Sequence, residues 1–416
     1  MKSLVTTQMI EDAATAIDGV AKKSPLQFSP RLSKLYKAKI YLKREDLQDV
    51  RSYKIRGAYN LIKSLSPVQQ KQGVVCASAG NHAQGVAFSC NLLKIKGTIF
   101  MPTLTPLQKI ARVRHFGDGW VEIKLVGTSF DESSAAAQDY SKKHKAVFVH
   151  PFDDPLVISG QGTVGKEIFE QAEEGIDYLL CPVGGGGLVS GAGTYLKNNN
   201  HKIKIVGVEA KGAPGMHTSL KTGRVVTLQE IDPFVDGVAV KTVGENTFSI
   251  ASRVVDKTVV IDEGQICTTM IELYQNEGIV TEPAGALSIS ALPELGPDLR
   301  GKVVVCILSG GNNDILRYPE IMGKSLVFKG LKHYFLIEFG QKPGQLKKLV
   351  DKVLGPNDDI VRFEYMKKNS KETGPALVGV ELSDKKDLAP LMKKLSQEGI
   401  TYTVLNPKDL LYKYLI

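Results

Sequence analysis

Cysteine is scarce in this 416-residue sequence, and its few positions exclude two classes of site. The count of five is odd, the positions are widely spaced, and neither a C-x-x-C pair nor a neighbouring histidine pair accompanies them. A disulfide framework is therefore not expected, and no metal site is indicated. Free buried thiols are typical of proteins in a reducing compartment. The five positions are Cys76, Cys90, Cys181, Cys267 and Cys306.

Long apolar runs are also missing. No stretch approaches the ~18 uninterrupted apolar residues that a transmembrane helix needs. Near the N-terminus, Glu11 and Asp12 come before any apolar run builds, so no signal-peptide core is indicated. We therefore expect a cytoplasmic protein that has no membrane partner.

The charge leans basic without pointing to nucleic acid. The chain has 53 Lys plus Arg against 44 Asp plus Glu, and residues 324–416 alone hold 17 of the first kind and 11 of the second. In that segment basic residues stand beside acidic ones, as in Asp384–Asp387, which is typical of solvated helix faces. The 43% hydrophobic content excludes global disorder and allows roughly two to four domains.

Up to about residue 320, short runs rich in Val and Ile alternate with segments of helical periodicity. Runs that are apolar on both faces and separated by helix-length crossovers predict parallel strands buried between helix layers. The prediction is a three-layer α/β region whose ligands bind beyond the carboxyl ends of the strands. The runs include 40–42, 73–77, 97–101, 146–149, 178–181, 205–208 and 303–308.

After Pro319 the pattern changes. The order β-α-β-β-α-β over about 85 residues predicts a ferredoxin-like α+β unit, present once. We expect two domains, 1–320 and 326–416. Within the second, strands are expected at 331–340, 360–366, 376–382 and 400–405, and helices at 343–354 and 384–398.

Lys54 is the first candidate for chemistry. Aromatic and aliphatic neighbours flank it, and a helix-like stretch follows, so its amine could be partly desolvated and ready to form an imine. A single lysine in such a setting is far more often a solvated surface residue. The assignment of Lys54 as a functional residue therefore depends on the motifs that follow.

Two small-residue turns follow buried-type strands. Ser78–Gly85 would expose backbone N–H groups at a helix start, suited to a carboxylate, and would leave the Asn81 amide free to meet a ring oxygen. A simple turn capped by Ser or Asn is about equally favoured. The glycine run of Gly184–Leu188 could converge several N–H groups on one phosphate, and a flexible linker is the weaker alternative.

A third glycine-rich segment matches a dinucleotide-binding motif but is not predicted to bind a dinucleotide. Gly160–Gly165 matches G-x-G-x-x-G, but Asp153–Pro155 break the strand that a dinucleotide-binding turn needs. A glycine-rich helix start is the favoured interpretation. The run at Gly184 lacks both this register and the G-K-[ST] of a P-loop.

Two more candidates stand late in the α/β region. Ser309 offers a hydroxyl just past a strand, and Glu282 in Thr281–Ala286 adds a carboxylate at a helix start. For Glu282, capping of the helix N-terminus is the stronger interpretation. Together, an imine-forming lysine, an asparagine turn, a tetraglycine phosphate site and a serine beyond a strand are the parts that hold pyridoxal 5'-phosphate.

These segments resemble, in order, the fold-type II pyridoxal-phosphate enzymes, and most closely the threonine dehydratases (threonine deaminases). The resemblance covers about residues 5–320 and implies a catalytic region of two α/β subdomains. The segments are SYKIRGA (52–58), SAGNHAQGVA (78–87), MPTLTPLQK (101–109), HPFDDPLVISGQGT (150–163), PVGGGGLVSG (182–191), TEPAGA (281–286) and LSGGNND (308–314).

The resemblance also implies roles for individual residues. Lys54 would bind the cofactor aldehyde covalently and act as the base, Asn81 would contact the ring oxygen, and Ser309 would meet the pyridine nitrogen. The phosphate would be held by Gly184, Gly185, Gly186, Gly187 and Leu188. The substrate carboxylate would be bound by Ser78, Ala79, Gly80, Asn81 and His82.

The C-terminal unit resembles the ACT-like regulatory domain of the biosynthetic form of these enzymes, in its single-copy variety. The resemblance implies conversion of L-threonine to 2-oxobutanoate and ammonia, the first step of isoleucine biosynthesis, with L-serine as a poorer substrate. It further implies inhibition by isoleucine, with valine as a second candidate effector, and a homotetramer.

Two alternatives stay open at this point. One is a serine or threonine racemase or another hydroxyamino-acid dehydratase; the other is an amino-acid sensor that binds the cofactor without catalysis. Ala79 stands where serine racemases carry the serine that serves as second base, so weak racemisation is expected. Glu209 matches one metal ligand of those racemases, but Gly215 replaces the other, so only one of the two carboxylate ligands is present.

Overall fold

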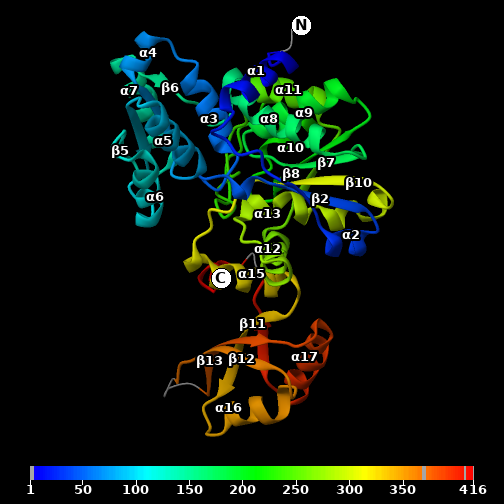
Figure 1. Cartoon of the computed structure of the whole chain (residues 1–416). Helices are drawn as coiled ribbons and strands as arrows, with labels where there is room; N and C mark the ends of the chain where they lie inside the picture. The colour runs from blue at the N-terminus through cyan, green and yellow to red at the C-terminus, as the bar shows by residue number, and fades with distance from the viewer. Residues whose placement is uncertain (1–3, 368–371, 407–408, 416) are drawn as a thin grey trace. The chain divides into compact units, whose positions relative to one another are not determined.

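A computed structural model of the chain describes residues 4–367, 372–406 and 409–415. Its contacts divide the chain into two units, Met1–Asn313 and Asp314–Ile416. Figure 1 shows that the first unit contains two separate sheets, each with its own helices, and that the second contains one. The two units are described separately.

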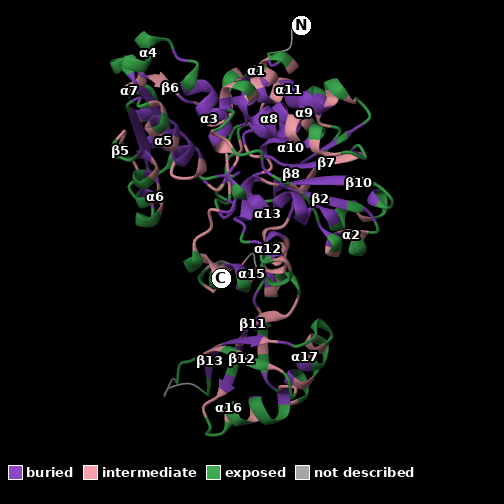
Figure 2. Ribbon diagram, viewed as in Figure 1, coloured by how far each residue is buried: buried purple, intermediate pink, exposed green. Residues whose placement is uncertain are grey.

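The larger sheet of the first unit has six strands in the order β1-β2-β10-β7-β8-β9, and every pairing except β1 with β2 is parallel. Its central strands are buried along almost their whole length (Figure 2). The strands are β1 (Leu26–Phe28), β2 (Lys39–Arg44), β7 (Tyr178–Pro182), β8 (Lys204–Ala210), β9 (Lys257–Ile261) and β10 (Val303–Leu308).

The smaller sheet is entirely parallel, in the order β5-β4-β3-β6. Apolar side chains of α3, α5 and α6 pack on one face, and those of α7 pack on the other. The α/β prediction with parallel strands between helix layers is therefore confirmed. The strands are β3 (Val74–Ala77), β4 (Gly97–Met101), β5 (Val121–Leu125) and β6 (Val147–Phe148).

The helices of the first unit begin with several sequence-encoded caps. Ser129 and Glu132 form a reciprocal capping box at the start of α7, and Asp154 accepts two N–H groups before Pro155 opens α8. The α-helices are α1 (Thr7–Ile17), α2 (Pro30–Tyr36), α3 (Lys54–Lys63), α4 (Pro67–Gln72), α5 (Asn81–Leu93), α6 (Leu107–Gly117), α7 (Phe130–His144), α8 (Pro155–Gln171), α9 (Gly187–Asn199), α10 (Gly215–Thr222), α11 (Glu245–Val254), α12 (Glu263–Glu277), α13 (Pro283–Ser290) and α14 (Leu292–Leu295), with short 3-10 turns η1 (Glu45–Leu47) and η2 (Gly296–Leu299).

The second unit is an antiparallel sheet in the order β12-β13-β11-β14, which confirms the ferredoxin-like prediction. Its core is formed by alternate residues of the strands, such as Phe335, Ile337 and Phe339, packed on the helices. The elements are η3 (Ile315–Arg317), α15 (Tyr318–Phe328), β11 (Lys332–Gly340), α16 (Gln345–Lys348), the π-helical turn η4 (Leu349–Val353), β12 (Asp359–Tyr365), β13 (Thr373–Glu381), η5 (Lys385–Asp387), α17 (Leu388–Gln397), β14 (Thr401–Val404) and η6 (Leu410–Tyr414).

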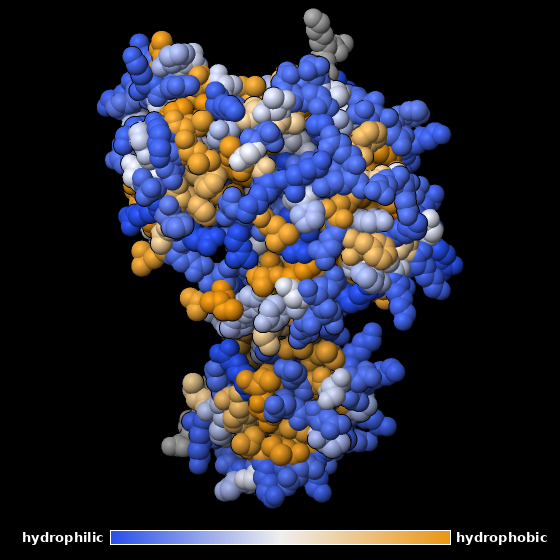
Figure 3. All heavy atoms as spheres, viewed as in Figure 1, coloured by the Kyte–Doolittle hydropathy of each residue, from blue (hydrophilic) through white to orange (hydrophobic). Residues whose placement is uncertain are grey.

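The exterior is mixed in character. On the face drawn in Figure 3, hydrophilic residues cover most of the surface and apolar residues gather in smaller groups between them. Among the described residues, no helix is both long and apolar enough to span a membrane. The five cysteines are buried and form no disulfide.

Candidate active site

Lys54 is the first residue of α3, and its amine lies inside the first unit. Its Nζ donates a hydrogen bond to the carbonyl oxygen of Pro151 at 2.9 Å. Burial lowers the pKa of this amine to about 8, although the nearby Glu282 carboxylate acts in the opposite direction. With a pKa of about 8, roughly a tenth of the amine is neutral at pH 7, far more than for an ordinary lysine, and nucleophilic attack on an aldehyde requires this neutral form.

Glycines on two neighbouring helices hold the α3 backbone in place. A Cβ on Gly85 of α5 would lie 3.1 Å from the carbonyl carbon and oxygen of Lys54. A Cβ on Gly160 of α8 would lie 2.6 Å from the Cα of Gly57 and 2.7 Å from the carbonyl oxygen of Arg56. A Cβ at Gly160 would force the α3 backbone to move, and one at Gly85 would require a shift of a few tenths of an ångström, so both helices restrict the position at which α3 begins.

The G-x-G-x-x-G segment, Gly160–Gly165, therefore has a packing role. Gly160–Gly165 lies in the interior of α8. The prediction that this segment is helical is confirmed, but the prediction that it starts the helix is wrong. Gly162 and Gly165 face the α9 backbone, where a Cβ would come within 3.1 Å of Gly191 O and 2.6 Å of Ala192 O. The periodic glycines let α8 pack tightly between α3 and α9.

The turn Ser78–His82 follows β3 and leads directly into α5. Gly80 is the N-cap residue, and no side chain caps this helix in the described structure. The Ser78 hydroxyl accepts a hydrogen bond from Gly80 N at 3.2 Å instead. The alternative of a turn capped by Ser or Asn is therefore wrong, and the first N–H groups of α5 remain available to an anion.

Within this turn, the side chain of His82 points into the core. It is buried, and its Nε2 donates to Val149 O at 2.8 Å. Burial and the nearby Lys54 lower its pKa to about 3, so the imidazole stays neutral. Only the backbone of His82 can contribute to the predicted carboxylate site.

The Asn81 amide lies between two polar side chains. Its Nδ2 donates to Glu282 Oε1 at 2.7 Å, and its Oδ1 accepts from Asn312 Nδ2 at 2.8 Å. The amide nitrogen carries two hydrogens, so one donor remains for another acceptor.

Glu282 corrects the sequence interpretation. It occupies the N-cap position of α13, but its side chain makes no cap hydrogen bond and binds Asn81 instead. Its carboxyl is 5% exposed, and burial together with Asp236 raises its pKa to about 7. No local signal predicts this contact, because the two residues stand 201 positions apart.

The glycine run connects β7 to α9, and protein atoms surround it. Gly186 has φ 94° and is the N-cap residue of α9, with no side-chain cap in the described structure. A Cβ on Gly185 would lie 2.3 Å from the Phe152 ring, and one on Gly184 would lie 2.8 Å from Val238 Cα. The alternative of a flexible linker is excluded, and Gly187 and Leu188 present the first N–H groups of α9.

Phe152 was not among the site residues predicted from the sequence. It connects the glycine run to Lys54. It follows Pro151, whose carbonyl binds Lys54 Nζ, and its ring packs against Gly185. The only sequence signal was its place in the segment HPFDDP.

Ser309 is the first residue after β10. Its hydroxyl is buried and donates to Ala284 O at 3.2 Å. Its carbonyl accepts a hydrogen bond from Tyr53 N at 3.2 Å, which places the end of β10 beside the start of α3.

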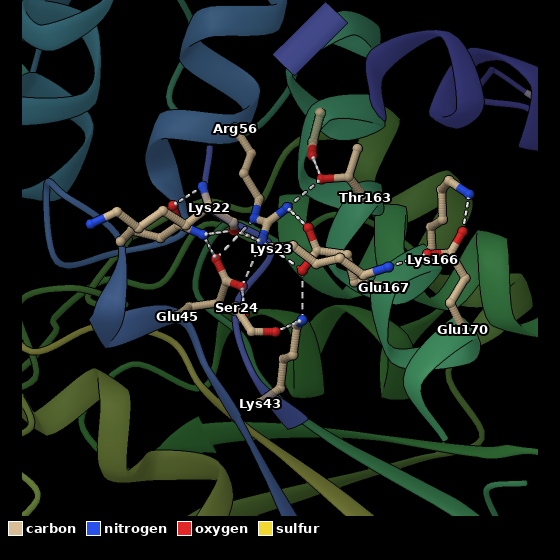
Figure 4. A network of polar contacts seen from close by, with 12 residues as sticks. Lys22, Lys23, Ser24, Lys43, Glu45, Arg56, Thr163, Lys166, Glu167 and Glu170 are labelled. Atoms are coloured by element: carbon tan, nitrogen blue, oxygen red, sulfur yellow. Dashed lines mark hydrogen bonds and ion pairs between the residues drawn. The ribbon is translucent and has the colours of Figure 1, made fainter. Parts of the chain in front are cut away.

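A buried ionic network lies under the start of α3, as Figure 4 shows. The Arg56 guanidinium binds Glu45 at 2.8 and 2.9 Å and Glu167 at 2.6 and 3.0 Å, and both Arg56 and Glu45 are 0% exposed. The buried amine of Lys43 also contacts Glu167 at 2.6 Å. Through Arg56, which follows Lys54 by two positions, the network connects α3 to η1 and α8.

These surroundings fit pyridoxal phosphate on structural grounds alone. A desolvated amine, two helix starts without side-chain caps and an amide with a spare donor match its aldehyde, its phosphate and its ring oxygen. The glycine run would not tolerate a Cβ at Gly184 or Gly185. The residues therefore provide the donor set that the cofactor needs.

Glu209, the matched metal ligand, is engaged differently. Its two carboxyl oxygens accept the backbone N–H groups of Met216 and His217 at 2.8 and 2.5 Å, at the start of α10. The part of the chain that the structure describes contains no group of three or more His, Cys, Asp or Glu side chains that could hold a metal ion.

Comparisons with known proteins agree over the whole chain. Residues 17–310 match the family model "Pyridoxal-phosphate dependent enzyme", and residues 323–415 match "C-terminal regulatory domain of Threonine dehydratase". The chain is 50% identical to L-threonine dehydratase biosynthetic IlvA of Halalkalibacterium halodurans, covering 98% of this chain and 99% of that one. It is also 50% identical to the protein of that name from Bacillus subtilis, covering 100% of this chain and 98% of the other.

Solved structures resemble the chain over about three quarters of its length. The processed form of threonine deaminase isoform 2 from Solanum lycopersicum has a TM-score of 0.73 at 39% identity, covering 76% of this chain and 92% of that one. Maize serine racemase has a TM-score of 0.71 at 30% identity, covering 78% and 99%.

Proposed function

Because this chain belongs to the biosynthetic threonine dehydratases, a family of pyridoxal-phosphate-dependent enzymes, we propose that it converts L-threonine to 2-oxobutanoate and ammonia. One observation carries the proposal at the level of chemistry. The partly neutral amine of Lys54 lies against Pro151, next to the Phe152 ring that packs on the glycine run.

Lys54 has two tasks in this proposal. Its amine would hold the cofactor covalently through the aldehyde, and its neutral form would take the proton from the substrate Cα. A pKa of about 8 suits both tasks, since the amine can accept and return a proton near neutral pH. Bound pyridoxal phosphate supplies the electron sink for this proton removal.

The other residues bind and orient. The uncapped N–H groups at the start of α9, with Gly184–Leu188, hold the cofactor phosphate, and those of Ser78–His82 hold the substrate carboxylate. The spare Asn81 donor meets the ring oxygen. The Ser309 hydroxyl meets the pyridine nitrogen, for which it must turn from Ala284 O.

Finer properties belong to the same proposal. L-Serine is a poorer substrate, isoleucine inhibits through the unit 314–416 with valine as a second candidate, and the enzyme is a homotetramer. The presence of the regulatory family over residues 323–415 supports the effector proposal. The five buried cysteines, which form no disulfide, support a cytoplasmic location.

The racemase alternative is favoured by the maize structure at 30% identity but opposed by Ala79. A methyl group cannot deliver a proton to the opposite face of Cα. Chiral chromatography of serine incubated with the enzyme decides the matter: we expect ketoacid and little D-serine. An amount of D-serine that exceeds the ketoacid would reassign the chain to the racemases.

The central test combines cofactor absorbance with product release. The protein loaded with pyridoxal phosphate should show a visible absorbance band and release ketoacid from threonine, and Lys54→Ala should lose both. Lys63→Ala, an exposed lysine at the other end of α3, is the matched control and should retain both. A colourless wild-type protein, or full activity in Lys54→Ala, contradicts the proposal.

A further inference from the structure

Glu282 stands out among the buried titratable groups, because no role in the chemistry described so far uses it. It is 5% exposed, and two glycines face its carboxyl. A Cβ on Gly310 would lie 2.4 Å from Glu282 Oε1, and one on Gly237 would lie 3.7 Å from it. The backbone thus leaves room for this carboxyl beside the end of β10.

The carboxyl is one end of a continuous chain of polar side chains. Arg112 Nη2 donates to Asn312 Oδ1 at 3.1 Å, Asn312 Nδ2 donates to Asn81 Oδ1 at 2.8 Å, and Asn81 Nδ2 donates to Glu282 Oε1 at 2.7 Å. Asn312 Nδ2 is itself oriented by Val50 O at 2.8 Å. The order of donors and acceptors is therefore defined at every link.

This order determines which way the Asn81 amide faces. An amide can turn by 180° about its last bond and exchange its oxygen and nitrogen. Turned over, Asn81 would put two donors opposite each other at Asn312, whatever the protonation state of Glu282, and two acceptors opposite each other at Glu282 when that carboxyl is ionised. Leaving both buried contacts unsatisfied is costly, so the pair selects one orientation.

We propose that Glu282 is a positioning residue that, together with Asn312, holds the Asn81 amide so that its second Nδ2 hydrogen is directed at the cofactor ring oxygen. The inference rests on the proposed function, in which Asn81 meets that oxygen. It adds that the residue acts through its hydrogen-bond acceptor and not through its charge.

The charged surroundings make that distinction testable. Lys54, Tyr53, Asp236 and Lys109 all act on Glu282 electrostatically. Glu282→Gln keeps an acceptor for Asn81 at the same length and removes the charge. Glu282→Asp keeps the charge and shortens the side chain by one methylene, so the 2.7 Å contact is lost.

The experiment measures the dissociation constant of pyridoxal phosphate and the position of the visible band in the full-length protein. We expect Glu282→Gln to stay within about threefold of wild type, and Glu282→Asp and Glu282→Ala to bind about tenfold more weakly with a shifted band, as for one lost hydrogen bond. Glu277→Ala is the control: it removes a carboxyl at the end of α12 that accepts hydrogen bonds from Arg31 and Ser29, and it should leave both readouts unchanged. Thermal unfolding of each variant identifies loss of fold.

The outcomes separate the two proposals. Wild-type affinity in Glu282→Asp together with weak binding in Glu282→Gln means that charge matters, and overturns the inference while the proposed function stands. Unchanged affinity and spectrum in all three variants also overturn it. A wild-type protein that binds no cofactor overturns the proposed function and this inference with it.

Discussion

Replacement of Arg56 by methionine tests whether the network in Figure 4 stabilises the site. Arg56 and Glu45 are both 0% exposed, so the substitution leaves a carboxylate inside the protein without its main partner. Burial acts to raise the pKa of Glu45, yet Arg56 and Lys43 hold that pKa below its ordinary value. The carboxylate is therefore charged in the folded protein and depends on its cations.

The magnitude follows from this geometry. Breaking a buried ion pair by removing one partner costs about 3–5 kcal/mol. Glu167 keeps Lys43 at 2.6 Å, so the loss falls mainly on Glu45, whose remaining bonds come from Ser24 at 2.5 Å and Gln48 at 3.2 Å. We expect Arg56→Met to lower the free energy of unfolding of the first unit by about 3–5 kcal/mol.

Urea denaturation measures the effect. The single tryptophan, Trp120, lies in the first unit, so its fluorescence reports on that unit. Lys211→Met, which breaks an exposed pair with Asp262 in the same unit, is the control and should cost at most about 1 kcal/mol.

A double variant makes the reasoning refutable. Glu45→Gln removes the charge that Arg56→Met leaves unpaired, so the double variant should be less destabilised than the sum of the two single ones. A cost below about 1 kcal/mol for Arg56→Met, or strictly additive effects, would refute the view that an uncompensated buried charge is the main penalty.

Two further predictions concern packing and pH. Gly160→Ala places a Cβ 2.6 Å from the backbone of Gly57, so it should cost about 1–3 kcal/mol in the same assay, whereas Gly296→Ala, with nothing within 4 Å, should be nearly neutral; equal stability of the two would contradict the close α3–α8 contact. Burial raises the pKa of Glu282 from 4.5 to about 7. Protonation of this carboxyl therefore stabilises the folded protein fully below pH 4.5, and this stabilisation is lost as the pH rises to 7. Wild type should therefore lose stability relative to Glu282→Gln between pH 5 and pH 8, by about 1.4 kcal/mol per unit of raised pKa, and a difference that does not change with pH would rule this out.

Much of the fold was predictable because buried parallel strands have a strong pattern. The runs at 97–101 and 303–308 coincide with β4 and β10, which are interior strands with neighbours on both sides. The apolar runs that predict strands do not include β1, β5 and β9, which all lie at sheet edges. Edge strands are partly exposed, as the alternation of charged and apolar residues in β5 shows, so their apolar signal is weaker.

The sequence by itself determined which residue types follow the buried strands: a lysine among apolar neighbours, small-residue turns, a glycine run and a serine. Local chain chemistry is enough for this, since turns and helix starts depend on near neighbours. Only the tertiary structure decided that Glu282 binds Asn81 and leaves α13 uncapped, and that Gly160–Gly165 packs helices. Those contacts join residues from 27 (Gly165 and Ala192) to 201 (Asn81 and Glu282) positions apart, and a hydrogen bond or a close approach between them exists only once the sheets and helices have packed.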